Sequence, residues 1–168
     1  TVGNDITSVQ EGAWRSEKLE KLFVYLAMNR NRGVCIEDIS EAIWQVEEET
    51  DNPVGALKNL AYRLRKALRD ASFDEECIVS VRGGLYKWND DVEVTIDVEE
   101  FDRYINEAEM AFCRSKETAI ESYEKAIALY HGDFLPLRTD THWFMTLNAF
   151  YHSRYVTTVK ALAKLSIY

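Results

Sequence analysis

The chain contains few of the residues that interrupt or cross-link a fold: its 168 residues include two prolines, seven glycines and three cysteines. No apolar run approaches the roughly 18 residues of a membrane-spanning helix, and no signal-peptide pattern opens the sequence, which argues against a membrane partner. The cysteines, Cys35, Cys77 and Cys113, lack CxxC spacing. So few thiols fit a reducing compartment and predict a cytoplasmic protein, with each cysteine a small buried residue by default.

Residues for catalysis or metal binding are also scarce. The histidines, His131, His142 and His152, all lie in the second half, and none has a cysteine or histidine partner at metal-binding spacing. The pair Gly83-Gly84 is not followed by the Lys-Ser/Thr pair and helix of a phosphate-binding loop. The sequence therefore predicts no enzyme, no cofactor and no metal site.

One stretch contains no acid: from Val54 to Arg69 there is no Asp or Glu, although the whole chain has a net charge of −9. Asn52 and Pro53 predict a helix start, because asparagine caps helices and proline suits the first helical position. At about 100° per residue, the apolar side chains then form one stripe, opposite a basic face. The stripe consists of Leu57, Ala61, Leu64 and Leu68, with Leu60 and Ala67 beside it. Leu60, at the edge of the stripe, could pack inward or touch DNA. The basic face consists of Lys58, Asn59, Tyr62, Arg63, Arg65, Lys66 and Arg69.

A helix of this kind can pack on a small domain through its stripe and offer its basic face to phosphates and base edges. The alternative is a solvated face, which is what most charge runs are. Acids cluster at Glu47–Glu49, Asp74–Glu76 and Asp90–Glu100. An acidic body with one basic face would repel phosphate except at a single surface, which favours specific over non-specific DNA binding.

The first half has the element order of a winged helix-turn-helix. Hydrophobic periodicity predicts helices at Glu17–Asn29 and Ile36–Trp44, the latter burying its tryptophan, ahead of the basic helix. Strands at Cys77–Val81 and Leu85–Trp88 are joined by the tight turn Arg82-Gly83-Gly84. In such a fold the third helix enters the major groove. The hairpin, or wing, would bring Arg82 to the minor groove or the backbone.

From Val98 to the end the residue pattern of the second half is helical. Predicted helices around Phe101–Ala108, Ala119–Tyr130 and Trp143–Leu165 are separated by short polar breaks. Helices of this length with alanines at packing positions suit a solenoid of tetratricopeptide type. The fold class is therefore mostly α with a small β-hairpin. We expect a winged-helix DNA-binding domain at 1–92, with a short or truncated amino-terminal sheet, and the start of a truncated helical domain at 93–168.

Both halves resemble one protein family. The runs IEDISEAIW, NLAYRLRKAL and VSVRGGLYKW resemble the OmpR-type winged helix of SARP-type bacterial transcriptional activators. The run YHGDFLP, with Trp143, resembles the bacterial transcriptional activator domain beside it. Cys35 departs from this pattern, since the family usually has a Ser or Thr cap there. A thiol at a helix start can be acidified, so redox sensing is an alternative to an inert cysteine.

The resemblance implies a sequence-specific activator that binds double-stranded DNA and contacts RNA polymerase. It also implies binding of directly repeated sites as a homodimer or tandem pair. An upstream receiver or other regulatory domain, as in two-component systems, is left open. Because the chain starts with Thr1 and stops within a helical pattern at Tyr168, we expect it to be a piece of a longer protein. The rival interpretation is a protein-interaction scaffold whose −9 charge prevents DNA binding. The candidate DNA-binding residues are Lys58, Asn59, Tyr62, Arg63, Arg65, Lys66, Arg69 and Arg82.

Overall fold

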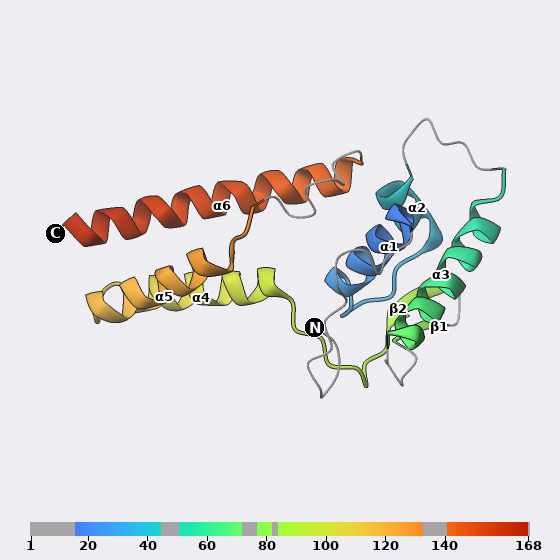
Figure 1. The fold of residues 1–168 in the computed structure, drawn as a ribbon, viewed down its shortest axis with the longest axis horizontal. Coiled ribbons are helices and arrows are strands. Elements are labelled where there is room, and N and C mark those ends of the chain that lie inside the picture. The colour runs from blue at the N-terminus through green and yellow to red at the C-terminus, as the bar shows by residue number, and fades with distance from the viewer. Residues whose placement is uncertain (1–15, 45–50, 72–76, 82–83, 133–140, 168) are drawn as a thin grey trace. The chain divides into compact units, whose positions relative to one another are not determined.

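The computed structural model describes residues 16–44, 51–71, 77–81, 84–132 and 141–167. Within these residues the chain is mostly helical, with one β-hairpin, as predicted (Figure 1). It divides into two compact units. The first is Thr1–Val94 with Asp140–Trp143, and the second is Thr95–Thr139 with Phe144–Tyr168.

Three helices form the core of the first unit. They are α1 (Glu17–Met28), α2 (Ile36–Ile43) and α3 (Pro53–Asp70), and each contacts the other two. Apolar side chains recur at three- and four-residue intervals on each helix, so each has one face to bury. The fully buried side chains include Leu22, Leu26, Ile39, Ile43, Leu57, Leu64 and Leu68.

Trp44 corrects one prediction, because it is only half-buried. The helix α2 ends at Ile43, and Trp44 follows as its C-cap with an extended backbone. Its ring lies beneath the ammonium of Lys18, at 5.8 Å from the ring centroid. Leaving the helix turns the side chain away from the stripe that periodicity alone assigned to it.

The predicted hairpin is present. Its strands, β1 (Ile78–Val81) and β2 (Leu85–Trp88), pair antiparallel, with Ile78 opposite Trp88. Gly84, in the turn, has a φ of +79°, a conformation that glycine adopts without steric cost. Trp88 is buried and meets the ring of Phe23 from α1 edge to face at 5.7 Å, so the helices hold the base of the hairpin.

A backbone bridge adds a further chain segment to the hairpin. Val34, just before α2, pairs antiparallel with Tyr86 of β2. The two residues exchange both backbone hydrogen bonds, at 2.7 and 2.8 Å. The connection between α1 and α2 is therefore tied to the wing by peptide groups, a contact that sequence periodicity did not predict.

Side-chain caps fix the starts of α2 and α3. The Asn52 Oδ1 accepts a hydrogen bond from the Gly55 amide at 2.8 Å, as expected of an N-cap. A Cβ at Gly55 would lie 2.7 Å from Asn52 Nδ2, so glycine leaves room for this cap. At α2 the Cys35 Sγ accepts from the Asp38 amide at 3.4 Å.

The environment of Cys35 does not favour a reactive thiolate. The Asp38 amide lowers the pKa of the thiol, but desolvation and the Glu37 and Asp38 carboxylates raise it more, so the net pKa lies above its usual value. Of the other cysteines, Cys77 is buried as expected, whereas Cys113 is exposed. The default of three buried thiols was therefore wrong for Cys113, and also for Cys35, which is only partly buried.

The second unit consists of α4 (Asp97–Ala111), α5 (Lys116–Leu129) and α6 (His142–Ile167) beyond its first two residues. Ser115 caps α5 by accepting from the Thr118 amide at 3.2 Å. One buried cluster joins the three helices and consists of Phe101, Ile105, Ala126 and Tyr151. An ion pair between Asp102 Oδ1 and Arg154 Nε, at 2.9 Å, also links α4 to α6.

Candidate nucleic-acid interface

The two faces of α3 differ in their exposure to solvent. The predicted apolar stripe faces the core, and this includes Leu60, which is only 6% exposed; Ala67 at the edge is half-buried. The opposite side is open to solvent, and the Tyr62 ring there is 61% exposed. The exposed polar and basic residues on this side are Lys58, Asn59, Tyr62, Arg63, Lys66 and Arg69.

The cations on this face are not neutralised by neighbouring carboxylates. Within the described part of the chain, Lys58, Arg63, Lys66 and Arg69 have no ion-pair partner. By contrast, Arg103 in the second unit pairs with both Glu100 and Glu107. Because the α3 charges are exposed and unpaired, binding a phosphate or a base edge there would break no existing salt bridge.

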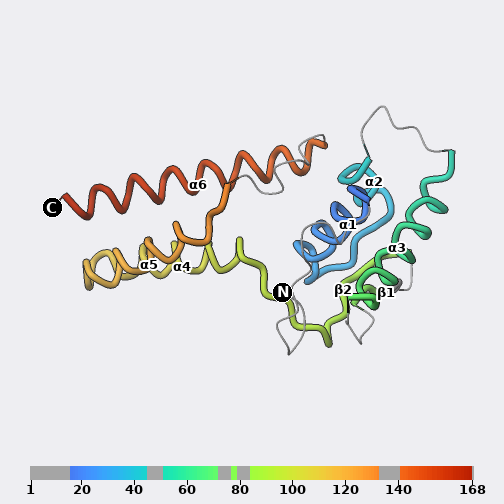
Figure 2. The backbone as a smooth tube through the Cα atoms, viewed as in Figure 1, coloured from blue at the N-terminus to red at the C-terminus, as the bar shows by residue number. Residues whose placement is uncertain are grey.

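Arg65 has a different environment from its neighbours on the helix. It is half-buried, and its Nε donates a hydrogen bond to the Ile78 carbonyl oxygen of β1 at 2.9 Å. Figure 2 shows the hairpin beside the second half of α3, where this contact forms. Arg65 therefore helps to hold the wing on α3, in addition to any contact with DNA.

Arg82, the predicted wing contact, lies outside the described residues, so its role stays a prediction. The hairpin that carries it is described up to Val81 on one side and from Gly84 on the other. The cation of the returning strand, Lys87, pairs with Asp90. Its charge is thus already matched, unlike those on α3.

A comparison with known protein families bears on the fold of the first unit. Residues 11–88 match the family model described as "Transcriptional regulatory protein, C terminal". The match includes α1, α2, α3 and the hairpin, and it ends at the last residue of β2. It confirms the OmpR-like winged helix, and it supports a DNA-binding transcriptional regulator. No curated protein matches the sequence of this chain.

A solved structure has the same fold. The chain is similar to Mycobacterium tuberculosis EmbR in complex with a low affinity phosphopeptide, with a TM-score of 0.72 and 20% sequence identity. The similarity covers 90% of this chain but only 40% of the EmbR chain, so the chain spans less than half the length of EmbR. The likeness shows the fold. The activator-domain identity of the second unit, which lies outside the family match, stays a prediction.

Sequence reasoning missed two features. Periodicity placed Arg65 on the open face but could not show that β1 covers that flank of α3. It also missed an open pocket in the second unit, although a signal was present: α6 contains no Asp or Glu and carries Lys160 and Lys164 four residues apart.

The described residues also bear on other kinds of site. No three of their His, Cys, Asp or Glu side chains come together in a way that could hold a metal ion. No helix among them is both long enough and apolar enough to cross a membrane.

Proposed function

We propose that the protein is a sequence-specific DNA-binding transcriptional activator whose helix α3 enters the major groove. One observation carries the proposal: the outer face of α3 presents exposed cations without carboxylate partners in the described chain, within a matched winged helix. The major groove admits one α-helix, and base edges there differ enough to be distinguished. The buried stripe on the other side holds this face outward.

The side chains on α3 suit different parts of a duplex. Arg63 and Asn59 have the geometry to bond guanine and adenine edges, because both can form paired hydrogen bonds with a base. Lys58, Lys66 and Arg69 suit phosphates, which fix position but carry no sequence information. Arg82 on the wing suits the minor groove, where negative potential concentrates.

The acidity of the rest of the chain fits this function. With a net charge of −9 and a sequence pI near 4.9, the protein would repel a duplex at most of its surface. Binding then depends on the α3 face, which should make it selective and strongly dependent on salt. The second unit, in this proposal, mediates self-association or receives a signal, and the activator contacts RNA polymerase.

A salt-titrated binding measurement tests the proposal. The 168-residue chain is first used to select bound sequences from a random duplex pool, and its affinity is then measured against salt concentration. Phosphate contacts release counterions, so we expect a steep linear fall of log affinity with log salt. Absence of binding at low salt would instead favour the protein-interaction scaffold, for which the −9 charge is the supporting observation.

A charge-matched control separates the α3 face from net charge. Arg114 is exposed, belongs to the second unit and has no carboxylate partner in the described chain. Arg63→Ala and Arg114→Ala each remove one positive charge. We expect only the first to weaken binding to the selected DNA. Equal losses would mean that overall charge, rather than the α3 face, governs binding.

A further inference from the structure

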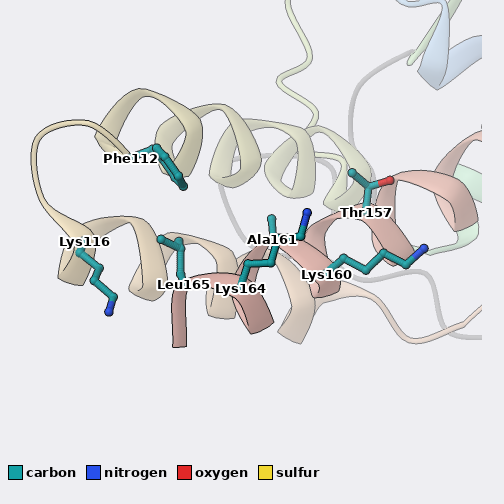
Figure 3. A pocket seen from close by; sticks show the side chains of 7 residues that line it. All are labelled: Phe112, Lys116, Thr157, Lys160, Ala161, Lys164 and Leu165. Atoms are coloured by element: carbon teal, nitrogen blue, oxygen red, sulfur yellow. The ribbon is translucent and has the colours of Figure 1, made fainter. Parts of the chain in front are cut away.

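The second unit contains an open pocket of about 600 Å³ that the proposed DNA-binding function does not use. It lies between α6 and the segment in which α4 ends and α5 begins (Figure 3). Its lining combines apolar side chains with lysines. The apolar ones are Phe112, Ala161 and Leu165, and the lysines are Lys116, Lys160 and Lys164.

The apolar part of the pocket is unusually exposed. Phe112 leaves 55% of its surface open to solvent, although it is a large aromatic residue. Ala161 and Leu165 lie one turn apart on α6 and extend the same apolar strip. Covering this strip with another molecule would remove its apolar surface from water, which favours binding.

The lysines form an unmatched positive edge. No carboxylate lines the pocket, and α6 contains no Asp or Glu from end to end. Within the described chain Lys116, Lys160 and Lys164 have no ion-pair partner. Three other cations of this unit do have partners: Arg103 with Glu100, Lys125 with Glu121, and Arg154 with Asp102.

Two of the lysines repel each other, and a bound anionic ligand would reduce this repulsion. Lys160 and Lys164 are four residues apart on one side of α6, and like charges at this spacing destabilise a helix. A negatively charged ligand would relieve that repulsion. In a protein of net charge −9, a positive edge of this kind would attract an acidic partner selectively.

The dimensions favour a peptide over a small anion. The lining runs along α6 from Thr157 to Leu165, which is about 12 Å or two helical turns. Figure 3 shows Lys116 and Lys160 toward the two ends of this lining, with Lys164 between them. A single carboxylate could not meet lysines spread in this way. A segment with several acids could.

We propose that this groove binds an acidic amphipathic helix of a partner protein. Apolar side chains at i, i+3 or i+4 of the incoming helix would contact Phe112, Ala161 and Leu165, and flanking carboxylates would meet the three lysines. The proposal does not depend on DNA binding, because all its residues lie in the second unit.

Fluorescence anisotropy with synthetic peptides tests the proposal on the full chain. The probe is a labelled helical peptide of about four turns, with leucines at i, i+3, i+4 and i+7 and glutamates beside them. One control peptide has lysine in place of each glutamate, and another has the same composition in scrambled order. We expect saturable, salt-sensitive binding of the acidic amphipathic peptide and at least about tenfold weaker binding of both controls.

Two double variants locate the binding. Lys160→Ala with Lys164→Ala should weaken peptide binding about tenfold and leave DNA binding unchanged, because only rim charges of the groove are lost. Lys58→Ala with Lys66→Ala removes the same charge from α3 and should do the reverse. All four side chains are exposed, so folding should be preserved, and far-UV circular dichroism checks this. Phe112→Ala removes the apolar contact and should also weaken peptide binding.

Several outcomes would overturn the proposal. They are a lack of saturable binding at low salt, equal binding of the scrambled peptide, or unchanged peptide affinity in the Lys160/Lys164 variant. Loss of peptide binding in the Lys58/Lys66 variant would place the peptide on α3 instead. Dodecanoate serves as a small-anion probe. Its binding by the parent but not by the Lys160/Lys164 variant, without any peptide binding by the parent, would assign the groove to a small amphipathic anion.

Discussion

Two helices of this protein, α3 between Val54 and Arg69 and α6 throughout, contain no carboxylate, yet they use their surfaces differently. On α3 the apolar side chains are buried along one stripe and the cations occupy the open side. On α6 only Phe144, Tyr151 and Thr158 are buried. Large apolar residues remain exposed on α6, including Met145, Phe150, Val159 and Ile167.

This difference separates two kinds of binding surface. The absence of Asp and Glu makes the local charge of both helices positive. The distribution of apolar residues then determines which kind of partner each helix suits. The polar, cationic face of α3 suits a duplex, whose surface is charged and hydrogen-bonding. The mixed apolar and cationic surface of α6 suits another protein, because a helix that is apolar on more than one side has surface still to bury.

The largest expected effect tests whether the apolar side of α3 is fully buried while apolar side chains of α6 are not. Leu64→Ala should lower the free energy of unfolding by about 2–5 kcal/mol, since this side chain is fully buried. Val159→Ala on α6 should change it by less than about 0.5 kcal/mol, because Val159 is 38% exposed. Urea unfolding measures both. Trp44, Trp88 and Trp143 belong to the first unit, so their fluorescence follows that unit, and far-UV circular dichroism follows the whole chain. Equal losses would contradict the comparison.

The next effect sharpens the assignment of the α3 face. Arg63→Ala should cost roughly 1–3 kcal/mol on the selected DNA and much less on unrelated sequences, as expected for a base contact. Lys66→Ala should weaken binding to all sequences alike and reduce the salt slope by about one unit. Gel-shift titrations on both DNAs at several salt concentrations make the measurement. If both variants bound like the parent, the site on α3 would be wrongly assigned.

Substitutions of Arg65 test whether one residue of α3 contributes to folding stability as well as to DNA binding. Arg65→Ala should lower the stability of the first unit by roughly 1–3 kcal/mol, because its Nε loses the Ile78 carbonyl. It should also weaken binding to all DNA and flatten the salt slope. Arg65→Lys keeps the positive charge, so it should restore the salt slope of DNA binding more fully than the stability of the first unit. A purely DNA-binding role would leave tryptophan-monitored unfolding of Arg65→Ala unchanged.

A smaller effect concerns the start of α3. Asn52→Ala should cost about 1 kcal/mol, because the Gly55 amide loses its cap. Gly55→Ala alone should gain little, since its Cβ would displace the Asn52 side chain. In the Asn52→Ala background the same change should stabilise by up to about 1 kcal/mol through helix propensity. A double-mutant cycle from urea unfolding measures this coupling, and additive effects would refute it.

The smallest effect concerns the packing of α6 on α4. Burial raises the pKa of Asp102, and this outweighs the lowering by Arg154 and by the Tyr151 hydroxyl. The pKa of Tyr151 itself is raised to about 12, mainly by burial. A carboxyl with a higher pKa in the folded state binds its proton more tightly there. The stability of the second unit should therefore fall as pH rises from the unfolded pKa of about 3.9 through the raised one.

Asp102→Asn should lack this step and be no less stable than the parent at neutral pH. The measurement is thermal unfolding by circular dichroism between acid and neutral pH, taken as the difference between parent and variant. Taking the difference matters because Glu100, whose pKa is lowered by Arg103, contributes the opposite slope in both proteins. A parent that gains stability over the variant with rising pH would contradict the raised pKa.

Local signals in the sequence were enough to predict most of the secondary structure of the first unit. Asn52, Pro53 and the leucine spacing predicted α3 with its observed start, and alternation with a glycine turn predicted the hairpin to within one residue. These signals act over a few residues, through capping, helical periodicity and turn conformation. They also predicted the exposure of Lys58, Arg63, Lys66 and Arg69, since burial of the stripe determines the other face, but not the half-burial of Arg65.

The missed features depend on contacts between distant residues. Trp44 left the stripe because α2 ended before it, and Arg65 met a strand carbonyl 13 residues away. Cys113 lies exposed in the α4–α5 connection, which composition could not indicate. The pocket beside Phe112 is lined by α6 and by residues from Phe112 to Lys116, which are distant from α6 in the sequence. Periodicity says which side of a helix is buried but not which neighbour covers its edges.

The exchange of peptide hydrogen bonds between Val34 and Tyr86 has a consequence for how such a protein could evolve. Main-chain atoms, which most substitutions leave in place, join the segment before α2 to the second strand of the wing. Under the proposed function, outward-facing side chains of α3 could be exchanged, and the preferred operator changed, without altering this backbone link. In that proposal, new target sequences would be reachable by a few point mutations that leave the link between the two segments in place.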